Sequence, residues 1–382
     1  MRAPEARPVP LPTADSVDYE PPSLDEVVMI HNGIEFAAAP SGGLTELQSL
    51  VWVEQCIAMT GFTPEASWRR PVGIQGFAEA LARRDWVFRV RMLQEIILIG
   101  MLARPATPEL DAKLRAVARA LSVGDEIIDA IERFGATSYD AAVVDFARNG
   151  YVANFEEFPR PVLHTDADLG DGWGAVEDDP ALAAKWAALE HLAPGTLGRR
   201  VWEFYRSRGF TFPGQPGSAP PLLAQHDWVH AVADYGTTLQ NELEVFGFIG
   251  RADDDPRGFS LLAMVIGLFE TGTIDTGAGL FEADAGHLSA DRGMAIRLAD
   301  ALRRGALARP DGDTPKAFLA IDWFAYAGLP IEEVRERFSI PPKSDRAVAA
   351  GSVRPWDPNG ISEFQLAAGQ ALAAAEGRPY VR

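Results

Sequence analysis

The sequence contains a single cysteine, Cys56, among 382 residues. One cysteine cannot form a disulfide within the chain, and it cannot supply a thiolate cluster for a metal. Cys56 lies in an apolar segment with helical periodicity, where a small buried side chain is expected rather than a reactive thiol. Any metal site must therefore be built from imidazole and carboxylate groups.

The sequence is also poor in basic charge and in long apolar runs. Thirty-five Lys and Arg residues stand against 54 Asp and Glu residues, a net charge of −19. That charge disfavours nucleic acid as a partner, because phosphate backbones attract basic surfaces. The longest apolar runs, 96–100 and 261–269, fall far short of the roughly 20 residues that span a membrane. With no signal-peptide pattern at the N-terminus, we expect a soluble cytoplasmic protein without a transmembrane segment.

Composition changes along the chain predict its organisation. Residues 1–40 are rich in proline and acid, which is typical of a disordered leader. Helical periodicity with short Gly, Pro, Asp or Thr joints runs through 41–150 and resumes over 181–345. Between them, 151–180 is an acidic linker rich in Gly and Pro. Residues 346–382 form a looser tail in which one last helix is expected. The sequence therefore predicts an all-α fold of two helical domains joined by that linker.

Two of the six histidines, His226 and His230, are four residues apart, with Asp227 beside the first and Glu242 farther on. On a helix, side chains at that spacing lie on one face, close enough to bind one ion. An unbroken helix would carry Glu242 about 18 Å beyond His230, at 1.5 Å per residue. The pattern therefore has two interpretations: the polar side of an ordinary helix, or a metal site that requires a turn.

The sequence supplies a turn at the required place. In 234–238, "DYGTT", Gly236 is a helix stop, and Thr237 and Thr238 are candidate N-caps. A helix ending near Asp234 and another starting near Leu239 would form a hairpin that returns the glutamate to the histidines. Two imidazoles with one or two carboxylates suit Zn²⁺ best, with Fe²⁺ and Mn²⁺ as alternatives.

The motif His-Asp-x-x-His, eleven residues, then Glu resembles the metal signature of the ubiquinone (coenzyme Q) biosynthesis protein 4 family. Here it comprises His226, Asp227, His230 and Glu242. The flanking segments are also similar to that family; they are 193–210, with its Gly-Thr-x-Gly turn, and 297–308 followed by 318–342. The resemblance covers about residues 180–345.

The resemblance implies an all-helical protein that binds a divalent metal, usually zinc, and associates peripherally with membranes. It implies that His226, Asp227, His230 and Glu242 are the metal ligands. Independently of the resemblance, the place of Asp227 beside the histidine face would let it relay a proton as a catalytic residue. The implied reaction is oxidative decarboxylation with hydroxylation of a prenylated aromatic ring. The alternative is a non-catalytic scaffold that binds a prenylated or quinone lipid and organises other quinone-biosynthesis proteins. A homodimer is compatible with both.

The N-terminal half is weakly similar to the tellurite-resistance-B-like helical domain. Ala103 and Arg104 stand where that family has an acidic turn before its metal-binding helix, although Glu109 is present. We therefore expect residues 41–150 to be an interaction module without an ion of its own.

Three further segments have a functional and a simpler interpretation. Two acidic loops, within 151–180 and 275–293, carry side chains that could bind a cation, but ordinary solvated loops are expected. The side chains are His164, Asp166, Asp168, Glu282, Asp284, His287 and Asp291. The apolar segment 259–269 could line a tunnel for a prenyl chain, but apolar stripes more often form core.

Overall fold

A computed structural model describes the residues 7–12, 21–40, 43–102, 108–123, 178–216, 218, 221–252, 262, 266, 292–309 and 318–382. Apart from a single bridge between Thr196 and Pro330, these residues contain helices and no strand. The prediction of an all-α fold is confirmed.

The chain divides into two compact units, which differ from the two contiguous domains that we expected. Unit 1 comprises Met1–Arg133 with Ile266–Ala299, and unit 2 comprises Phe134–Val265 with Asp300–Arg382. Most of the expected linker, 151–177, lies outside the described residues. Composition could not predict this division, because unit 1 includes Ile266–Ala299, a segment far along the sequence from the rest of that unit.

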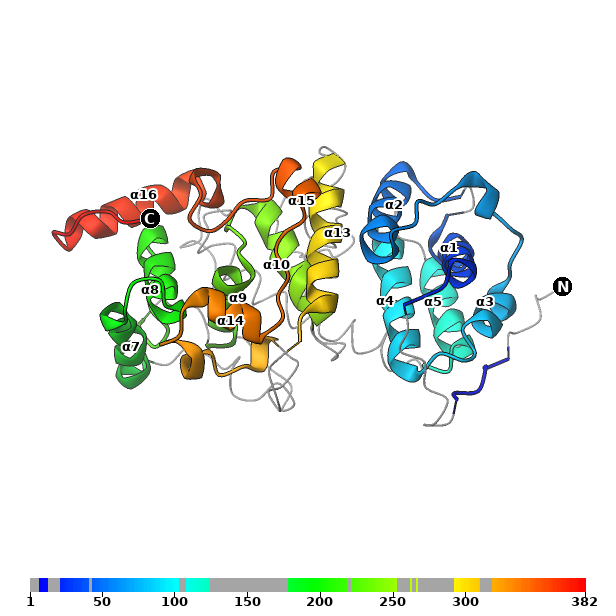
Figure 1. The fold of residues 1–382 in the computed structure, drawn as a ribbon, viewed down its shortest axis with the longest axis horizontal. Coiled ribbons are helices and arrows are strands. Elements are labelled where there is room, and N and C mark those ends of the chain that lie inside the picture. Colours follow the sequence, from blue (N-terminus) through cyan, green and yellow to red (C-terminus); the bar gives the residue numbers. More distant parts are fainter. Residues whose placement is uncertain are drawn as a thin grey trace. The chain divides into compact units, whose positions relative to one another are not determined.

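Unit 1 is built around its first helix. Its described helices are α1 (Leu24–Ala38), α2 (Glu46–Thr60), η2 (Ala66–Trp68), α3 (Ile74–Ala80), α4 (Trp86–Met101) and α5 (Pro108–Ala120) (Figure 1). Helix α1 contacts α3, α4 and α5, while α2 contacts α4. Gly33 of α1 faces the ring of Phe77, and a Cβ at this glycine would come within 2.6 Å of the ring. The absence of a side chain at Gly33 is therefore what lets α3 approach α1.

Helix α1 corrects the expectation that residues 1–40 form a disordered leader. It begins after Ser23, whose side chain forms a capping box with Glu26. Val27, Ile34 and Ala37, at helical spacing on one face, are buried. All prolines of this stretch except Pro40 precede the helix, and averaging composition over forty residues concealed its apolar stripe.

Unit 2 surrounds the helix that carries the two histidines. Its described elements are α7 (Pro180–Ala187), η5 (Ala188–His191), α8 (Leu197–Arg208), α9 (Pro221–Ala233), α10 (Leu239–Ala252), η7 (Phe318–Ala320), η8 (Trp323–Tyr326), α14 (Ile331–Arg337), α15 (Asp345–Ala349), η9 (Pro358–Gly360) and α16 (Glu363–Ala375). The end of α13 (Arg292–Leu307) also belongs to it. Helix α9 contacts α8, α10, α14 and η7 and lies among the other helices of this unit (Figure 1). Most of its described side chains are buried.

The C-terminal segment is part of this unit rather than the loose tail that we expected over 346–382. The expected last helix is α16, which packs on α8. A Cβ at Gly369 of α16 would lie 1.9 Å from the carbonyl oxygen of Ser207, so the two backbones nearly touch. The buried guanidinium of Arg208 donates to the carbonyls of Pro355 and Gly360. These contacts join groups about 150 residues apart in sequence, which local patterning does not reveal.

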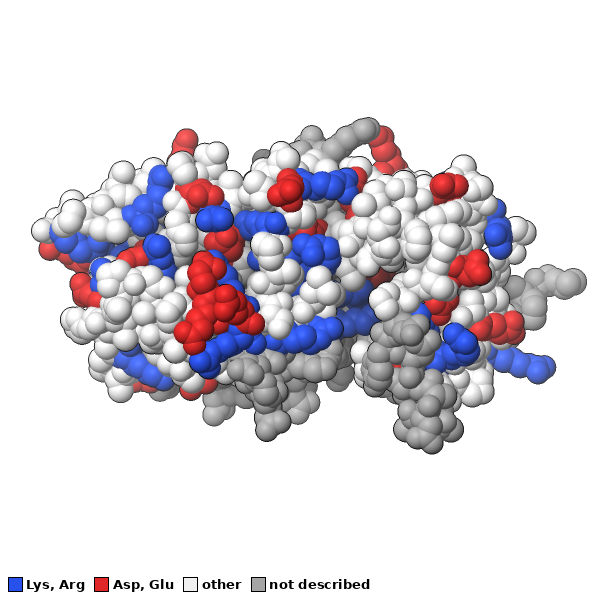
Figure 2. Space-filling model, viewed as in Figure 1, with Lys and Arg blue, Asp and Glu red and all other residues white. Residues whose placement is uncertain are grey.

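Charge on the surface is mixed despite the acidic total. In the view of Figure 2, basic and acidic side chains are interspersed over the described residues, and acidic ones gather over α14. No described helix combines the length and the apolar character that crossing a membrane requires.

Candidate metal centre

The turn between α9 and α10 is the first determinant of the site. Helix α9 ends at Ala233 and α10 begins at Leu239, as the sequence predicts. The residue that ends α9 is Asp234, with φ of 68°, and not Gly236. Aspartate tolerates this left-handed conformation better than most residues do.

Gly236 has a different role from the helix stop that we expected. A Cβ there would lie 2.6 Å from Cα of Gly360 and 2.6 Å from Oδ1 of Asn241. The backbone N–H of Gly236 donates to the carbonyl of Val353, and that of Thr237 donates to the carbonyl of Gly360. The glycine is therefore needed for close approach of the C-terminal segment, which holds the turn in place.

The last carbonyls of α9 are capped by two arginines. Arg335 donates to the carbonyls of Ala231 and Val232 and pairs with Asp234 at 3.1 Å. Arg304 donates to the carbonyl of Ala233 at 2.8 Å. Cations at a helix C-terminus oppose the negative end of its dipole and satisfy its free acceptors. The end of the histidine helix is thus fixed from two sides.

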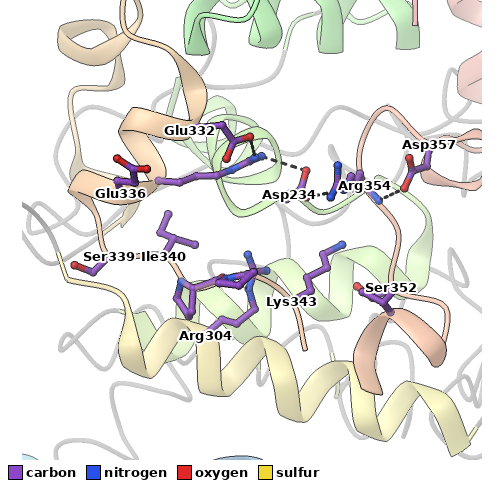
Figure 3. Close-up of a pocket in the computed structure, with 14 residues that line it drawn as sticks. Asp234, Arg304, Glu332, Glu336, Ser339, Ile340, Lys343, Ser352, Arg354 and Asp357 are labelled. Carbon is purple, nitrogen blue, oxygen red and sulfur yellow. Dashed lines mark hydrogen bonds and ion pairs between the residues drawn. The ribbon is translucent and has the colours of Figure 1, made fainter. Parts of the chain in front are cut away.

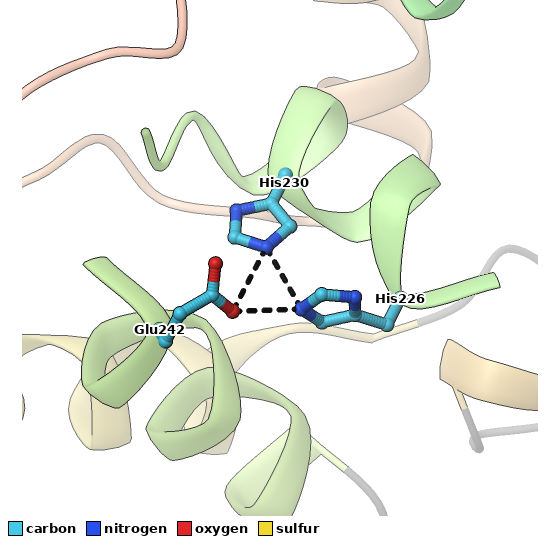
Figure 4. A group of neighbouring side chains, drawn as sticks. All are labelled: His226, His230 and Glu242. Atoms are coloured by element: carbon cyan, nitrogen blue, oxygen red, sulfur yellow. Dashed lines mark hydrogen bonds and ion pairs between the residues drawn. The ribbon is translucent and has the colours of Figure 1, made fainter. Parts of the chain in front are cut away.

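The hairpin brings three predicted ligands together (Figure 4). The Nε2 atoms of His226 and His230 are 2.8 Å apart, and Oε2 of Glu242 lies 3.0 Å from the first and 3.3 Å from the second. All three side chains are buried, with exposed fractions of 2% or less. Two imidazoles from successive turns of α9 and one carboxylate from the first turn of α10 therefore converge on a single point.

These distances fit a bound divalent ion. Metal–ligand bonds of about 2.0–2.1 Å give ligand–ligand edges of about 3.3 Å in a tetrahedron and about 3.0 Å in an octahedron. The observed 2.8–3.3 Å covers both geometries. Moreover, Oε1 of Glu242 is buried and accepts no hydrogen bond from any described residue. A buried carboxylate with an unsatisfied oxygen is costly unless a cation compensates it.

The protonation of His230 favours metal binding. Its Nδ1 lies 3.3 Å from the carbonyl oxygen of Tyr235. A carbonyl can only accept a hydrogen bond, so Nδ1 carries the proton, and the lone pair of Nε2 points to the other two ligands. Burial lowers the pKa of His230, which keeps the ring neutral, although Glu242 acts in the opposite direction.

The carboxylate is held in its charged form. Burial raises the pKa of Glu242, but a proton held on the neighbouring histidines outweighs burial through its charge and hydrogen bonds, and it lowers the pKa to about 2. Metal binding requires a neutral imidazole and an ionised carboxylate. The ionised form of Glu242 is therefore present while a histidine carries a proton, and a bound ion would take the place of that proton.

Aromatic rings hold the histidines from the side. Phe246 of α10 stacks on His226, with ring centres 4.9 Å apart and planes within 10°. Phe204 of α8 stacks on His230 at 5.7 Å and 29°. Apolar walls of this kind exclude water and strengthen the electrostatic interactions of a bound ion.

Asp227 takes a different position from the other predicted ligands. Its Oδ1 lies 3.4 Å from Nδ1 of His226, on the edge of the ring opposite the Nε2 that faces Glu242. Its Oδ2 accepts a hydrogen bond of 2.5 Å from the hydroxyl of Tyr205. Asp227 therefore lies beside the group of His226, His230 and Glu242, but its oxygens are not among the atoms that converge. Tyr205 was not predicted; its sequence signal is an aromatic residue in the helix 197–208 that precedes the motif.

Few of the remaining candidates lie within the described residues. Glu109 is exposed and pairs with Lys113 on α5 at 3.3 Å. Ala103 and Arg104 lie outside the described residues, as do the acidic loop groups of 164–168 and 282–291. In the apolar segment 259–269 the structure describes Leu262 and Ile266, which are both buried.

Comparison with known proteins gives this chain no relative. It matches no protein-family model, no curated protein sequence and no solved structure.

Proposed function

We propose that this chain binds one divalent metal ion through His226, His230 and Glu242, and that it acts in the maturation of a quinone ring. The reaction that we propose is oxidative decarboxylation with hydroxylation of a prenylated aromatic substrate. The observation that supports the metal is the convergence of three buried ligand atoms within 3.3 Å of one another. The ring chemistry rests on the spaced motif described above.

The donor set of two imidazoles and one carboxylate restricts the choice of metal. Zinc uses it in metallopeptidases, and Fe(II) uses it in the facial triad of oxygenases. A bound ion would polarise an oxygen of the substrate and, as iron, would also exchange electrons with an oxidant such as O₂. Zinc has no redox chemistry. Iron is therefore the metal we expect if the chain catalyses an oxidation, and zinc if it does not.

The chain's own residues would prepare the site for that chemistry. The contacts of Asp227 favour a positioning role: it receives the Tyr205 hydroxyl and faces Nδ1 of His226. A carboxylate behind a metal-binding imidazole fixes the ring orientation and raises its basicity. This role replaces the direct proton relay that the sequence suggested for Asp227.

A second function, a non-catalytic scaffold, is favoured by one specific observation. His230 and Glu242 have no exposed surface, and His226 has 2%. Structural zinc sites are closed, whereas catalytic sites keep an open position. In the scaffold, the ion would stabilise the α9–α10 hairpin. A prenylated lipid and other quinone-biosynthesis proteins would bind elsewhere on the chain.

Elemental analysis of the protein as purified tests the proposal. We expect about one equivalent of divalent metal per chain, lost on His230→Ala because two ligands bind too weakly. His191→Ala is the matched control, since it removes an exposed imidazole of the same unit. Equal metal content in both variants would place the ion elsewhere and refute the assignment.

The choice between enzyme and scaffold needs a second readout. Cells that lack quinone-ring maturation should recover quinone when they express the wild-type chain. An enzyme requires redox-active metal, so the His230→Ala chain should fail to restore quinone even when it is abundant and folded. Full recovery of quinone with the metal-free variant would refute the enzyme and support the scaffold. If neither chain restored quinone, the assignment to quinone-ring maturation would be refuted.

A further inference from the structure

Tyr235, in the turn between α9 and α10, contacts His230 through both of its main-chain polar groups. Its N–H donates to the carbonyl of His230 at 3.0 Å. Its own carbonyl lies 3.3 Å from Nδ1 of the same histidine, whose Nε2 faces the other two candidate ligands. These two contacts tie both the main chain and the imidazole of His230 to a single residue of the turn.

The conformation of Asp234 allows this double contact. Its left-handed φ of 68° turns the chain at the end of α9. The N–H of Tyr235 then points back to the carbonyl five residues earlier, as in a Schellman motif. The carboxylate of Asp234 pairs with Arg335 at 3.1 Å and with Arg354 at 3.3 Å. Ion pairs therefore hold the turn on the side of the aspartate.

The ring of Tyr235 anchors the turn in the interior of unit 2. The residue is 1% exposed, and its ring meets Phe248 of α10 edge to face, with centres 6.4 Å apart. The guanidinium of Arg304 and the ammonium of Lys343 lie 4.9 Å and 4.7 Å from the centre of the ring. Contacts between a cation and an aromatic face are stronger where water is excluded. Side chains from α10, α13 and the segment after α14 thus hold the ring, and through it the carbonyl that faces His230.

Arg304 holds the turn at a second point. Its guanidinium donates to the carbonyl of Ala233, the last residue of α9, at 2.8 Å. Arg304, Lys343 and Asp234 also line a cavity of about 470 Å³ beside the turn (Figure 3). A turn that borders open space can shift once its anchor is removed, because fewer neighbouring side chains block the movement. The geometry of the turn therefore depends on the anchors that it has.

We propose that Tyr235 is a positioning residue for His230, with its ring as the anchor and its main-chain carbonyl as the group that directs Nε2 of the histidine to the metal. This inference rests on the metal centre proposed above. A carbonyl that accepts a hydrogen bond from the far nitrogen of a metal-binding imidazole fixes the tautomer and the orientation of the ring. Asp227 faces Nδ1 of His226 in the same way. Each histidine thus has its own orienting group, a side chain for His226 and the main chain for His230.

Metal binding by variants of the full-length protein tests this role, with Zn²⁺ competed against a chelating dye and Co²⁺ as a spectroscopic probe. Tyr235→Leu should bind Zn²⁺ about tenfold or more weakly, as is typical when an outer partner of a ligand is lost. Its Co²⁺ absorption spectrum should also differ from that of the wild type, because the orientation of one ligand is no longer fixed. Tyr235→Phe should match the wild type in both measurements, since it keeps the ring that the two cations face.

Phe338→Leu is the matched control. It removes a buried ring of the same unit that packs on Phe318, Trp323 and Tyr326, none of which belongs to the turn. Both leucine variants should lower the free energy of unfolding, but only Tyr235→Leu should change Zn²⁺ affinity and the Co²⁺ spectrum. If Tyr235→Leu does not fold, Tyr235→Met, which keeps more of the side-chain length, takes its place with the same expected result.

The possible outcomes separate this role from the metal centre itself. Wild-type Zn²⁺ affinity and an unchanged Co²⁺ spectrum in Tyr235→Leu would overturn the role of Tyr235 and leave the metal centre intact. Equal losses of affinity in Tyr235→Leu and Phe338→Leu would trace the effect to general stability and would also overturn it. A wild-type chain that binds neither Zn²⁺ nor Co²⁺ would refute the metal centre, and the positioning role with it.

Discussion

The hydroxyl of Tyr205 donates a hydrogen bond of 2.5 Å to Oδ2 of Asp227, across 22 residues of sequence. The other oxygen of Asp227 faces the imidazole of His226 at 3.4 Å. Helix α8 thus reaches the candidate metal centre through this carboxylate, in addition to the stacking of Phe204 on His230. The Tyr205 hydroxyl, the Asp227 carboxylate and the His226 imidazole form a chain of contacts. This chain gives Asp227 a role in the motif although its oxygens do not reach the point where the other three side chains converge.

Tyr205→Phe should weaken metal binding while the fold persists. The substitution keeps the ring, which packs against Phe212 and Trp186, but it leaves Asp227 without its donor. Loss of such an outer partner typically costs about 10- to 100-fold in metal affinity. Competition with a chelating dye measures it, and Tyr380→Phe is the matched control, because its hydroxyl bonds the carbonyl of Ser207 instead. Equal affinities in the two variants would contradict the role of Tyr205.

Gly236→Ala should destabilise unit 2 by about 1–3 kcal/mol, the usual cost of overpacking. The added Cβ would meet the backbone of Gly360, which cannot move without disturbing the segment before α16. Gly328→Ala is the control, since a Cβ there meets nothing within 4 Å. Denaturant unfolding of both variants measures the difference. An unchanged midpoint for Gly236→Ala would show that the close approach to Gly360 is not needed.

Arg208→Met should destabilise the fold by about 2–4 kcal/mol, because it removes a charged donor from several buried acceptors. The carbonyls of Pro355 and Gly360 and the hydroxyl of Thr237 would each lose a donor. Arg200→Met removes a half-exposed arginine from the same helix and should cost below about 1 kcal/mol. Urea denaturation compares the free energies of unfolding of the two variants. Equal losses would mean that the contacts of Arg208 do not stabilise the packing of residues 346–382, which would then be the loose tail that we expected.

The pair Glu26–Arg84 should make the stability of unit 1 depend on pH. The hydrogen bond from Arg84 lowers the pKa of Glu26 from 4.5 to about 2, although burial opposes the shift. Because the folded pKa is depressed, the contribution is present above pH 4.5 and is lost as pH falls toward 2. The pair is partly solvated, so we expect about 1–2 kcal/mol.

Unfolding of Glu26→Gln at two pH values tests that linkage. The variant should be less stable than wild type at pH 7, and the difference should shrink as the solution is acidified below the unfolded pKa. Glu79→Gln is the control, because Glu79 of α3 is exposed and its carboxylate accepts a hydrogen bond from Gln75. A difference that persists unchanged at acid pH would exclude ionisation of Glu26 as its source.

The success and the failures of the sequence predictions have physical reasons. The positions of His226, His230 and Glu242 were predictable, because i,i+4 spacing and a helix break are local properties of the chain. The distance between Tyr205 and Asp227 depends on how α8 crosses α9, which no local pattern specifies. Gly236 was assigned the wrong role for the same reason, since its neighbour Gly360 is more than a hundred residues away in sequence.

Asp227→Asn distinguishes positioning from proton transfer at the metal centre. Asparagine keeps the size of the side chain and can still meet the Tyr205 hydroxyl, but it loses the charge that supports His226 through Nδ1. If Asp227 positions the ligand, metal affinity should fall by about tenfold or more, and excess metal should restore quinone formation. If it relays a proton, the metal should remain bound and activity should stay lost at any metal concentration. We expect the first result, and a double substitution with Tyr205→Phe should then cost less than the sum of the single changes, since both act on the same imidazole.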